Sequence, residues 1–426
     1  MSGPGAHGRP HPLLRDAFAA LDRAGVDWCV LRGEPELAHP RGDVDLLVSR
    51  SDREEAVAAL RRIGFVRLPA YGRGSHSFLR AYHCPTDRWL TLDVVMELSY
   101  GPAFSLATGA EDGCLRRRRR AGAVAVLAPD DAFWTLLLHC ILDKRAVEAH
   151  HAERLEALAE VALPDGPLGS LVAARSPVGW SPRRILRAAR SRDWQALVGL
   201  YPRLVRSSTR AHPASVAARI ATQRVLRLAE KPAVWRSRRG LSVALLGPDG
   251  AGKTTLAREV ARSFCFPGTT TYMGLWQGEG EAQLSVWRAC ARALLRPAAS
   301  VRRYLAARLE QERGRLVVFD RYTYDAYLPP RPPLVRAKRL YFWLLARTCP
   351  APDLLLLLDA PGELLATRKR EHTPEELEWQ RRHFLGLRRR FPGLQLVDAA
   401  RPPEDVKADV LDRIWTQYRA RVEGHA

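Results

Sequence analysis

Residues able to bind phosphate occupy one short stretch of the chain. The sequence Gly-Pro-Asp-Gly-Ala-Gly-Lys-Thr at 247–254 is a complete G-x-x-x-x-G-K-[ST] loop. Glycines let successive backbone N–H groups turn toward phosphate oxygens, while the lysine reaches the terminal phosphates and the threonine hydroxyl is a ligand for Mg²⁺. We expect the nucleotide to be bound by Gly247, Asp249, Gly250, Gly252, Lys253, Thr254 and Thr255. The loop therefore predicts a site for a nucleoside triphosphate.

The segments around this loop have the pattern that such a site needs. The apolar run 241–246 predicts a buried strand before the loop, and 255–262 predicts a helix after it, whose N-terminus favours anions. Beyond this point short apolar strands alternate with helical segments, which is typical of a parallel sheet wrapped by helices. The strand 316–319 ends in Asp320, directly before Arg321. Ligands of open α/β sheets bind at the carboxyl ends of strands, so we expect Asp320 to hold Mg²⁺ near the loop.

A second group of chemically suitable residues lies near the N-terminus. Asp43 and Asp45 occupy one predicted strand, and residues two apart on a strand point to the same face. Asp93 lies in another predicted strand, 88–95. Three carboxylates on neighbouring strands are what a two-metal site uses to clamp a triphosphate. We therefore expect Asp43, Asp45 and Asp93 to bind metal ions.

Five motifs in the C-terminal half resemble those of the thymidylate kinase family of nucleoside monophosphate kinases. They are the phosphate-binding loop at 247–255, Phe-Asp-Arg-Tyr at 319–322, Pro-Asp-Leu-Leu-Leu-Leu-Leu-Asp at 352–359, Arg-Lys-Arg-Glu-His-Thr-Pro-Glu-Glu-Leu-Glu at 368–378, and Val-Asp-Ala-Ala-Arg-Pro-Pro-Glu-Asp-Val at 397–406. The resemblance implies ATP and Mg²⁺ as cofactors, nucleotides as substrates, and a homodimer. By position, Asp249 would contact a sugar hydroxyl of the acceptor, Asp320 the metal and phosphates, and Arg321 the acceptor phosphate.

Residues 367–382 resemble the family's lid segment. Thr373 and Glu376 have the spacing of a capping box, with Pro374 at the first helical position. Cations upstream of this helix stabilise the transition state when the lid closes, because phosphoryl transfer spreads negative charge over the moving group. The loop itself has no arginine, which resembles the branch whose lid supplies it. The expected catalytic residues are Lys253, Asp320, Arg321, Arg368 and Arg370.

The acceptor pocket departs from the family pattern. After Asp-Arg-Tyr the family tends to have a serine and Ala-Tyr-Gln, whereas this chain has Tyr-Asp-Ala-Tyr at 324–327. Thymidylate, converted from dTMP to dTDP, is the leading acceptor. Two alternatives stay open: a kinase for a different small molecule, and a nucleotide-binding switch with little catalysis.

The first hundred residues resemble the polymerase-beta-like nucleotidyltransferase superfamily. Its pattern is a Gly-containing turn, a D-x-D strand and a later acid on a strand, matched here by Gly33, Asp43, Asp45 and Asp93. Gly33-Glu34 stands where the superfamily usually has Gly-Ser. The alternatives are a fold of this kind that has lost catalysis, or an ordinary strand with exposed acids.

These patterns predict an α/β chain of several parts. We expect a disordered tail at 1–12, an α+β nucleotidyltransferase-like domain at 13–128, a helical connector at 129–235, and a P-loop kinase domain with a parallel sheet flanked by helices at 236–426. The connector contains His139, His150 and His151. We find no second ligand cluster at metal spacing in the sequence, so we expect ordinary surface histidines.

Composition limits the class of protein. The chain has 67 basic and 46 acidic residues, a net charge of +21 that suits anionic ligands. No interleaving of aromatic and basic residues indicates a nucleic-acid surface, and the composition does not exclude one. The N-terminus lacks the apolar segment of a secretory signal, and no apolar run is long enough for a bilayer. We expect a cytoplasmic protein with reduced cysteines and no membrane partner.

Overall fold

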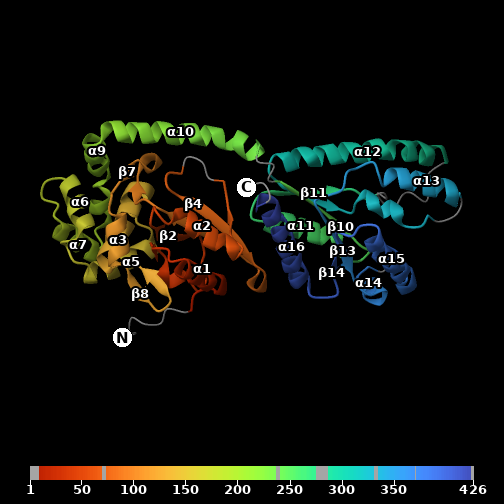
Figure 1. The fold of residues 1–426 in the computed structure, drawn as a ribbon, viewed down its shortest axis with the longest axis horizontal. Coiled ribbons are helices and arrows are strands. Elements are labelled where there is room, and N and C mark those ends of the chain that lie inside the picture. Colours follow the sequence, from red (N-terminus) through yellow and green to blue (C-terminus); the bar gives the residue numbers. More distant parts are fainter. Residues whose placement is uncertain are drawn as a thin grey trace. The chain divides into compact units, whose positions relative to one another are not determined.

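The chain folds into two compact units, which Figure 1 shows in a computed structural model. The structure describes residues 9–69, 73–236, 240–274, 286–330, 334–369 and 371–423. The N-terminal unit contains the residues up to 83 and 89–231. The C-terminal unit contains 84–88 and the residues from 232 onward.

A mixed seven-stranded sheet forms the centre of the N-terminal unit. Its strand order is β3-β4-β5-β2-β1-β9-β8. These strands are β1 (Trp28–Val30), β2 (Val44–Val48), β3 (Val66–Arg67), β4 (Ser77–His83), β5 (Arg88–Val95), β8 (Arg119–Ala121) and β9 (Val124–Val126). A separate two-stranded sheet pairs β6 (Ser99–Tyr100) with β7 (Leu106–Ala107). The central pair, β2 and β5, is parallel, so their side chains lie in register.

Helices around this sheet share its hydrophobic core. They are α1 (Pro12–Arg23), α2 (Arg53–Arg62), α3 (Glu111–Arg117), α4 (Pro129–Leu138), α5 (Ala149–Val161), α6 (Pro167–Arg175), α7 (Pro182–Arg190), α8 (Trp194–Val198), α9 (Tyr201–Ala211) and α10 (Pro213–Arg236). Leu14, Phe18 and Leu21 lie on one face of α1 and are buried, and the Phe18 ring stacks on Trp28 with centroids 4.8 Å apart. The same core continues through α4 to α9, so the segment expected as a connector packs with the sheet in one unit.

Both ends of this unit differ from the sequence-based expectation. His11, expected in the tail, is 4% exposed, and its ring nitrogen accepts a hydrogen bond from the Leu13 amide, capping α1. Residues 1–8 of the expected tail lie outside the described residues. The expected connector, 129–235, ends inside α10, which continues to Arg236 with Pro232 inside the helix.

The C-terminal unit is built on a parallel sheet of five strands. Its order is β11-β12-β10-β13-β14, from β10 (Leu241–Leu246), β11 (Gly268–Tyr272), β12 (Leu316–Asp320), β13 (Leu354–Asp359) and β14 (Leu394–Asp398). Helices flank this sheet (Figure 1), namely α11 (Lys253–Ser263), α12 (Val286–Glu312), α13 (Val335–Leu345), α14 (Gly362–Arg368), α15 (Pro374–Gly386) and α16 (Pro403–Glu423). The expected parallel sheet flanked by helices is thus confirmed.

The strand order places the phosphate-binding loop at the centre of this unit. From β10 the chain moves to β11 and β12 on one side, and then crosses to β13 on the other. The carboxyl end of β10 is therefore a switch point, where open parallel sheets have their ligand crevice. Every residue of β10 is buried, which accounts for its unbroken apolar sequence.

Among the described residues, no helix has both the length and the apolar character needed to cross a bilayer.

Candidate active site

The phosphate-binding loop joins β10 to the start of α11. Gly247 has a φ of 144°, and a Cβ there would lie 2.6 Å from the Leu358 carbonyl oxygen, so only glycine fits. Lys253 is the first residue of α11 and is 5% exposed. Its ammonium group donates to the carbonyl oxygens of Gly247 at 2.8 Å and Pro248 at 2.6 Å. Burial, and next the charge of Arg321, lower the pKa of Lys253 to about 8.

The strand register brings an acid to this loop. β12 pairs with β10 so that Asp320 lies opposite Leu245, near the start of the loop. The Thr254 hydroxyl donates to Asp320 Oδ2 at 2.6 Å. Asp320 Oδ1 is buried, and no hydrogen-bond partner for it occurs among the described residues. A hydroxyl group and a carboxylate with an unpaired oxygen fit Mg²⁺. This ion prefers oxygen ligands, and the protein usually supplies only one or two of them.

Arg321 lies between two carboxylates at the end of β12. Its guanidinium contacts Asp249 in the loop, and Asp325 Oδ2 at 3.4 Å. Arg321 has a φ of 65°, a conformation that costs energy outside glycine and is concentrated at functional sites. Burial opposes the ionisation of Asp249, but Arg321 and Lys253 outweigh it and lower the pKa of that carboxyl.

Asp325 is the acid that our sequence-based site omitted. It lies in the segment after Asp-Arg-Tyr that departs from the family pattern, is 4% exposed, and has a buried Oδ1 with no partner among the described residues. Burial raises the pKa of this carboxyl, although Arg321 opposes the shift. The change of residue type was visible in the sequence, but its contact with Arg321 was not.

The segment 367–382, which we expect to form a lid, contains the capping box that the spacing predicted. The Thr373 hydroxyl accepts from the Glu376 amide, and the Glu376 carboxylate accepts from the Thr373 amide at the start of α15. Arg381 of α15 donates to both oxygens of Asp359 at the end of β13, at 2.6 and 3.0 Å. This ion pair connects α15 to the end of β13.

Arg368 is one of the two arginines expected to act from the lid. Arg368 donates to the Ala399 carbonyl oxygen at 2.8 Å and lines a 410 Å³ cavity together with Gly250, Gly252 and Thr255. Its side chain therefore lines the same cavity as the phosphate-binding loop. Arg370 lies outside the described residues.

In the N-terminal unit, the strand register brings two of the three predicted acids together. Asp45 on β2 lies directly opposite Asp93 on β5. Each carboxylate already has a basic partner, since Arg32 Nη2 lies 2.9 Å from Asp45 Oδ2 and His76 Nδ1 lies 2.8 Å from Asp93 Oδ2. Asp93 Oδ1 is buried without a partner among the described residues, and thus has a lone pair for a cation.

Asp43 is the exposed member of this group. Loss of water around its carboxyl raises its pKa, Arg80 opposes the shift, and Asp93 and Asp45 add to it. A metal ion would relieve the repulsion among these three acids, so the residues fit a cation that displaces Arg32 and His76.

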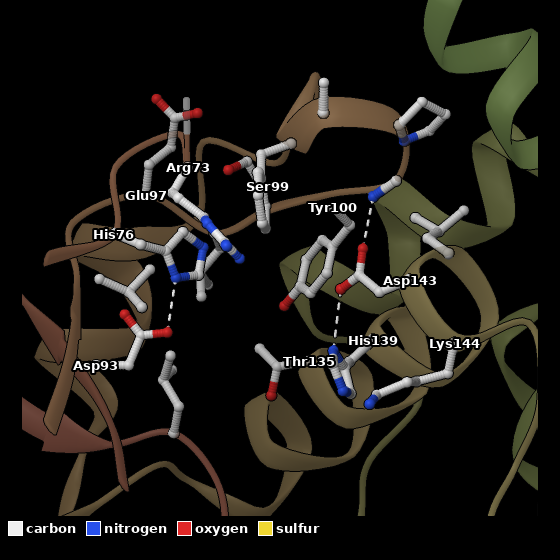
Figure 2. Close-up of a pocket in the computed structure, with 18 of the residues that line it drawn as sticks. Arg73, His76, Asp93, Glu97, Ser99, Tyr100, Thr135, His139, Asp143 and Lys144 are labelled. Atoms are coloured by element: carbon white, nitrogen blue, oxygen red, sulfur yellow. Dashed lines mark hydrogen bonds and ion pairs between the residues drawn. The ribbon is translucent and has the colours of Figure 1, made fainter. Parts of the chain in front are cut away.

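Two cavities of 530 and 720 Å³ flank these strands. Both are lined by Leu31, Arg32, His139 and Lys144. Figure 2 shows the smaller one, where His76 points to Asp93 on one side and His139 to Asp143 on the other. The larger one is lined by Asp43 and Asp45. The predicted acids therefore face space large enough for a small ligand.

Comparison with known proteins bears on one part of the chain. No protein-family model matches it. The thymidylate kinase of Xylella fastidiosa (strain M12) is 30% identical over 206 residues, which cover 90% of that protein and 43% of this chain. The phosphate-binding loop, the Asp-Arg pair and the expected lid segment lie in the C-terminal unit, and this match does not support the nucleotidyltransferase-like resemblance.

Proposed function

Because this chain belongs to the thymidylate kinase family, we propose that its C-terminal unit transfers the γ-phosphate of ATP to a small-molecule acceptor. The observation that carries this proposal is the meeting of Lys253, Thr254 and Asp320 at the carboxyl end of the central strand. Three groups that bind phosphate and Mg²⁺ converge there from a loop and a neighbouring strand.

Each residue has a distinct part in this reaction. Lys253 exchanges its two carbonyl partners for the terminal phosphates of ATP, and the N-terminus of α11 adds its dipole. Thr254 and Asp320 hold Mg²⁺, which neutralises charge on the phosphates when bound. Arg368, and Arg370 in the same segment, supply positive charge when the lid closes, so they stabilise the transition state more than the ground state.

Thymidylate is the first acceptor to test. The relative that supports this choice is named a thymidylate kinase. In this proposal Arg321 binds the acceptor phosphate and Asp249 binds a hydroxyl group of its sugar.

A second acceptor class is favoured by Asp325. Arg321 is already neutralised by Asp249 and Asp325, so its charge is less available to an incoming phosphate dianion. Such a pocket suits an acceptor that reacts through a hydroxyl group, with a carboxylate to accept the proton. The kinase site would then be retained with a different substrate.

The test is incubation of the full chain with Mg-ATP and a panel of nucleoside monophosphates and phosphate-free hydroxyl compounds, with products identified by mass. One added phosphate on thymidylate alone supports the first acceptor, and one on a hydroxyl compound supports the second. Lys253→Ala should lower turnover by at least about 100-fold, because it removes a charge aimed at the reacting phosphates. Lys338→Ala on α13 is the matched control. Equal turnover of Lys253→Ala and the unmodified chain would contradict the kinase proposal, and ATP binding without any product would indicate a switch.

For the N-terminal unit we propose Mg²⁺-dependent nucleotidyl transfer at Asp43, Asp45 and Asp93. The register of Asp45 and Asp93 and the adjoining cavities support it. Release of pyrophosphate from nucleoside triphosphates measures the reaction. The double substitution Asp43→Asn, Asp45→Asn should abolish it, whereas Asp16→Asn on the exposed side of α1 should not. Pyrophosphate release that survives the double substitution excludes this site.

A further inference from the structure

Three possible metal ligands meet where α5 begins. Glu148 is the residue before the helix, and His150 and His151 lie in its first turn. One ligand atom from each lies within 4.8 Å of the others, and His150 Nδ1 is 3.7 Å from Glu148 Oε2. We expected ordinary surface histidines here, because the sequence shows no second ligand cluster at metal spacing.

His151 has unused hydrogen-bonding capacity. Its Nδ1 is buried, and no partner for it occurs in the described parts of the chain. Buried polar atoms in proteins nearly always have a partner, so an orphan of this kind calls for a ligand, an ion or water. The His139 ring lies 5.9 Å from the His151 ring. His139 Nδ1 is also 2.9 Å from Asp143 Oδ2, a pair that a dashed line marks in Figure 2.

The charge of the surrounding cavity favours a cation. Six carboxylates line the 720 Å³ cavity, from Glu34, Glu36, Asp43, Asp45, Glu148 and Glu153. Three permanent cations oppose them, from Arg32, Lys144 and Arg154. In a chain with a net charge of +21, this cavity is acidic. The local excess of negative charge raises the concentration of cations there.

We propose that Glu148, His150 and His151 form a binding site for a divalent transition metal, with Zn²⁺ as the best match. Two imidazoles and one carboxylate are a ligand set of zinc sites, whereas Mg²⁺ and Ca²⁺ prefer oxygen ligands alone. This site uses none of the three aspartates of the nucleotidyl-transfer proposal, although it shares a cavity with Asp43 and Asp45, and it does not depend on either proposed reaction.

The geometry needs only a small closure to fit the ion. Bonds of about 2.0 to 2.2 Å place tetrahedral ligand atoms roughly 3.4 Å apart. The carboxylate and the His150 nitrogen are near this spacing, and both side chains are more than half exposed. Three protein ligands leave a fourth position open to water or to an oxygen of a ligand in the cavity.

The experiment measures zinc on the tag-free full chain after treatment with a chelator. Competition with a chromophoric chelator gives the affinity, elemental analysis gives the stoichiometry, and Co²⁺ absorption reports the coordination. We expect one Zn²⁺ per chain. His150→Ala and His151→Ala should each weaken binding by about 100-fold or more, since loss of an outer partner alone costs roughly 10- to 100-fold.

Controls separate this site from adventitious binding by histidines. His212→Ala, at an exposed histidine after α9, should leave the affinity unchanged. His150→Cys should retain zinc, because a thiolate replaces the imidazole as a ligand. Because His150 is exposed, its variants test the site even where His151→Ala fails to fold. The proposal is wrong if the unmodified chain binds no zinc, if His150→Ala binds it equally well, or if His212→Ala loses as much affinity.

Discussion

At the scale of single residues, the charged groups of the candidate kinase site are paired with other groups of the protein when no ligand is bound. Lys253 is held by two carbonyl oxygens of its own loop, and Arg321 by Asp249 and Asp325. Burial makes each of these charges costly unless it is paired. Binding of ATP and acceptor therefore exchanges internal partners for ligand phosphates, and the pKa values of these groups are sensitive to that exchange.

The affinity for Mg-ATP should fall as pH rises above about 8. The pKa of free Lys253 is about 8, below its usual value, and ATP phosphates must raise it because they favour the charged amine. Below this pH the amine is already protonated, and above it binding must take up a proton, which weakens affinity by up to about tenfold per pH unit. Equilibrium titrations from about pH 7.5 to 9.5 measure the effect. Lys253→Ala should bind weakly with no such slope, and a parallel slope in that variant would assign the effect to another group.

Asp325→Ser should improve recognition of a phosphorylated acceptor. The substitution removes one of the two carboxylates that neutralise Arg321, so more of its charge can bind phosphate. With a nucleoside monophosphate we expect KM to fall several-fold while the KM for ATP stays constant. Steady-state kinetics with each substrate varied in turn measure this, with Asp405→Ser on α16 as a control. A lower turnover with a hydroxyl acceptor, and no gain with monophosphates, would instead favour the second acceptor class.

At the scale of elements, the position of the lid depends on close packing between α14 and α15. Gly362, at the start of α14, has no room for a side chain, since a Cβ would lie 2.4 Å from the Pro374 carbonyl oxygen and 2.8 Å from the Glu378 amide. The Gly362 amide also donates to Glu378 Oε2 at 3.3 Å. Contact between the backbones of α14 and α15 therefore fixes the orientation of α15 relative to α14.

Gly362→Ala should therefore destabilise the C-terminal unit. The added methyl group must push α15 away from α14, and overpacking of this kind costs about 1 to 3 kcal/mol. Denaturant unfolding monitored with and without Mg-ATP measures the change in the free energy of unfolding. Gly386→Ala, at the end of α15 where a Cβ meets no atom within 4 Å, should be neutral or stabilising by up to about 1 kcal/mol. Equal effects of the two variants would contradict the proposed close packing of α14 on α15.

At the scale of the whole molecule, the chain has two units with separate sheets and separate candidate sites. The phosphate-binding loop and lid belong to the C-terminal unit, whereas the three aspartates and the Glu148, His150 and His151 cluster belong to the N-terminal one. A ligand stabilises the parts of a protein whose native state binds it, so each site can be tested through the unit that contains it.

In the chain with Asp43→Asn and Asp45→Asn, which removes the proposed N-terminal nucleotide site, Mg-ATP should slow hydrogen exchange in the C-terminal unit and leave the N-terminal sheet unchanged. At a concentration 100 times the dissociation constant, amides of β10 and α11 that exchange through unfolding of their unit should exchange about 100-fold more slowly. Peptide-level exchange with mass detection measures this, with Mg²⁺ alone as the control. Equal protection of β2 and β5 would mean that the N-terminal unit also binds the nucleotide or unfolds together with its neighbour.

Local sequence was sufficient wherever the chemistry lies within a few consecutive residues. The phosphate-binding loop, its strand and helix, and the Thr373 capping box were predicted because their hydrogen bonds join residues close in the chain. The buried strands of the parallel sheet were equally visible, since strands covered on both faces are continuously apolar. These local patterns are sufficient to indicate a P-loop fold.

Contacts between residues far apart in the chain depend on the fold. Periodicity tells which face of a strand or helix is buried, but the register between strands and the packing of helices select the partner. The fold thus brings Asp320 to Thr254 and places a second carboxylate beside Arg321. It also pairs Asp93 with His76, and it puts the Glu148, His150 and His151 cluster on the cavity that Asp43 and Asp45 line. Consecutive residues were thus enough to indicate phosphate chemistry, whereas the fold places the charges that a substrate would meet, because those charges act through space.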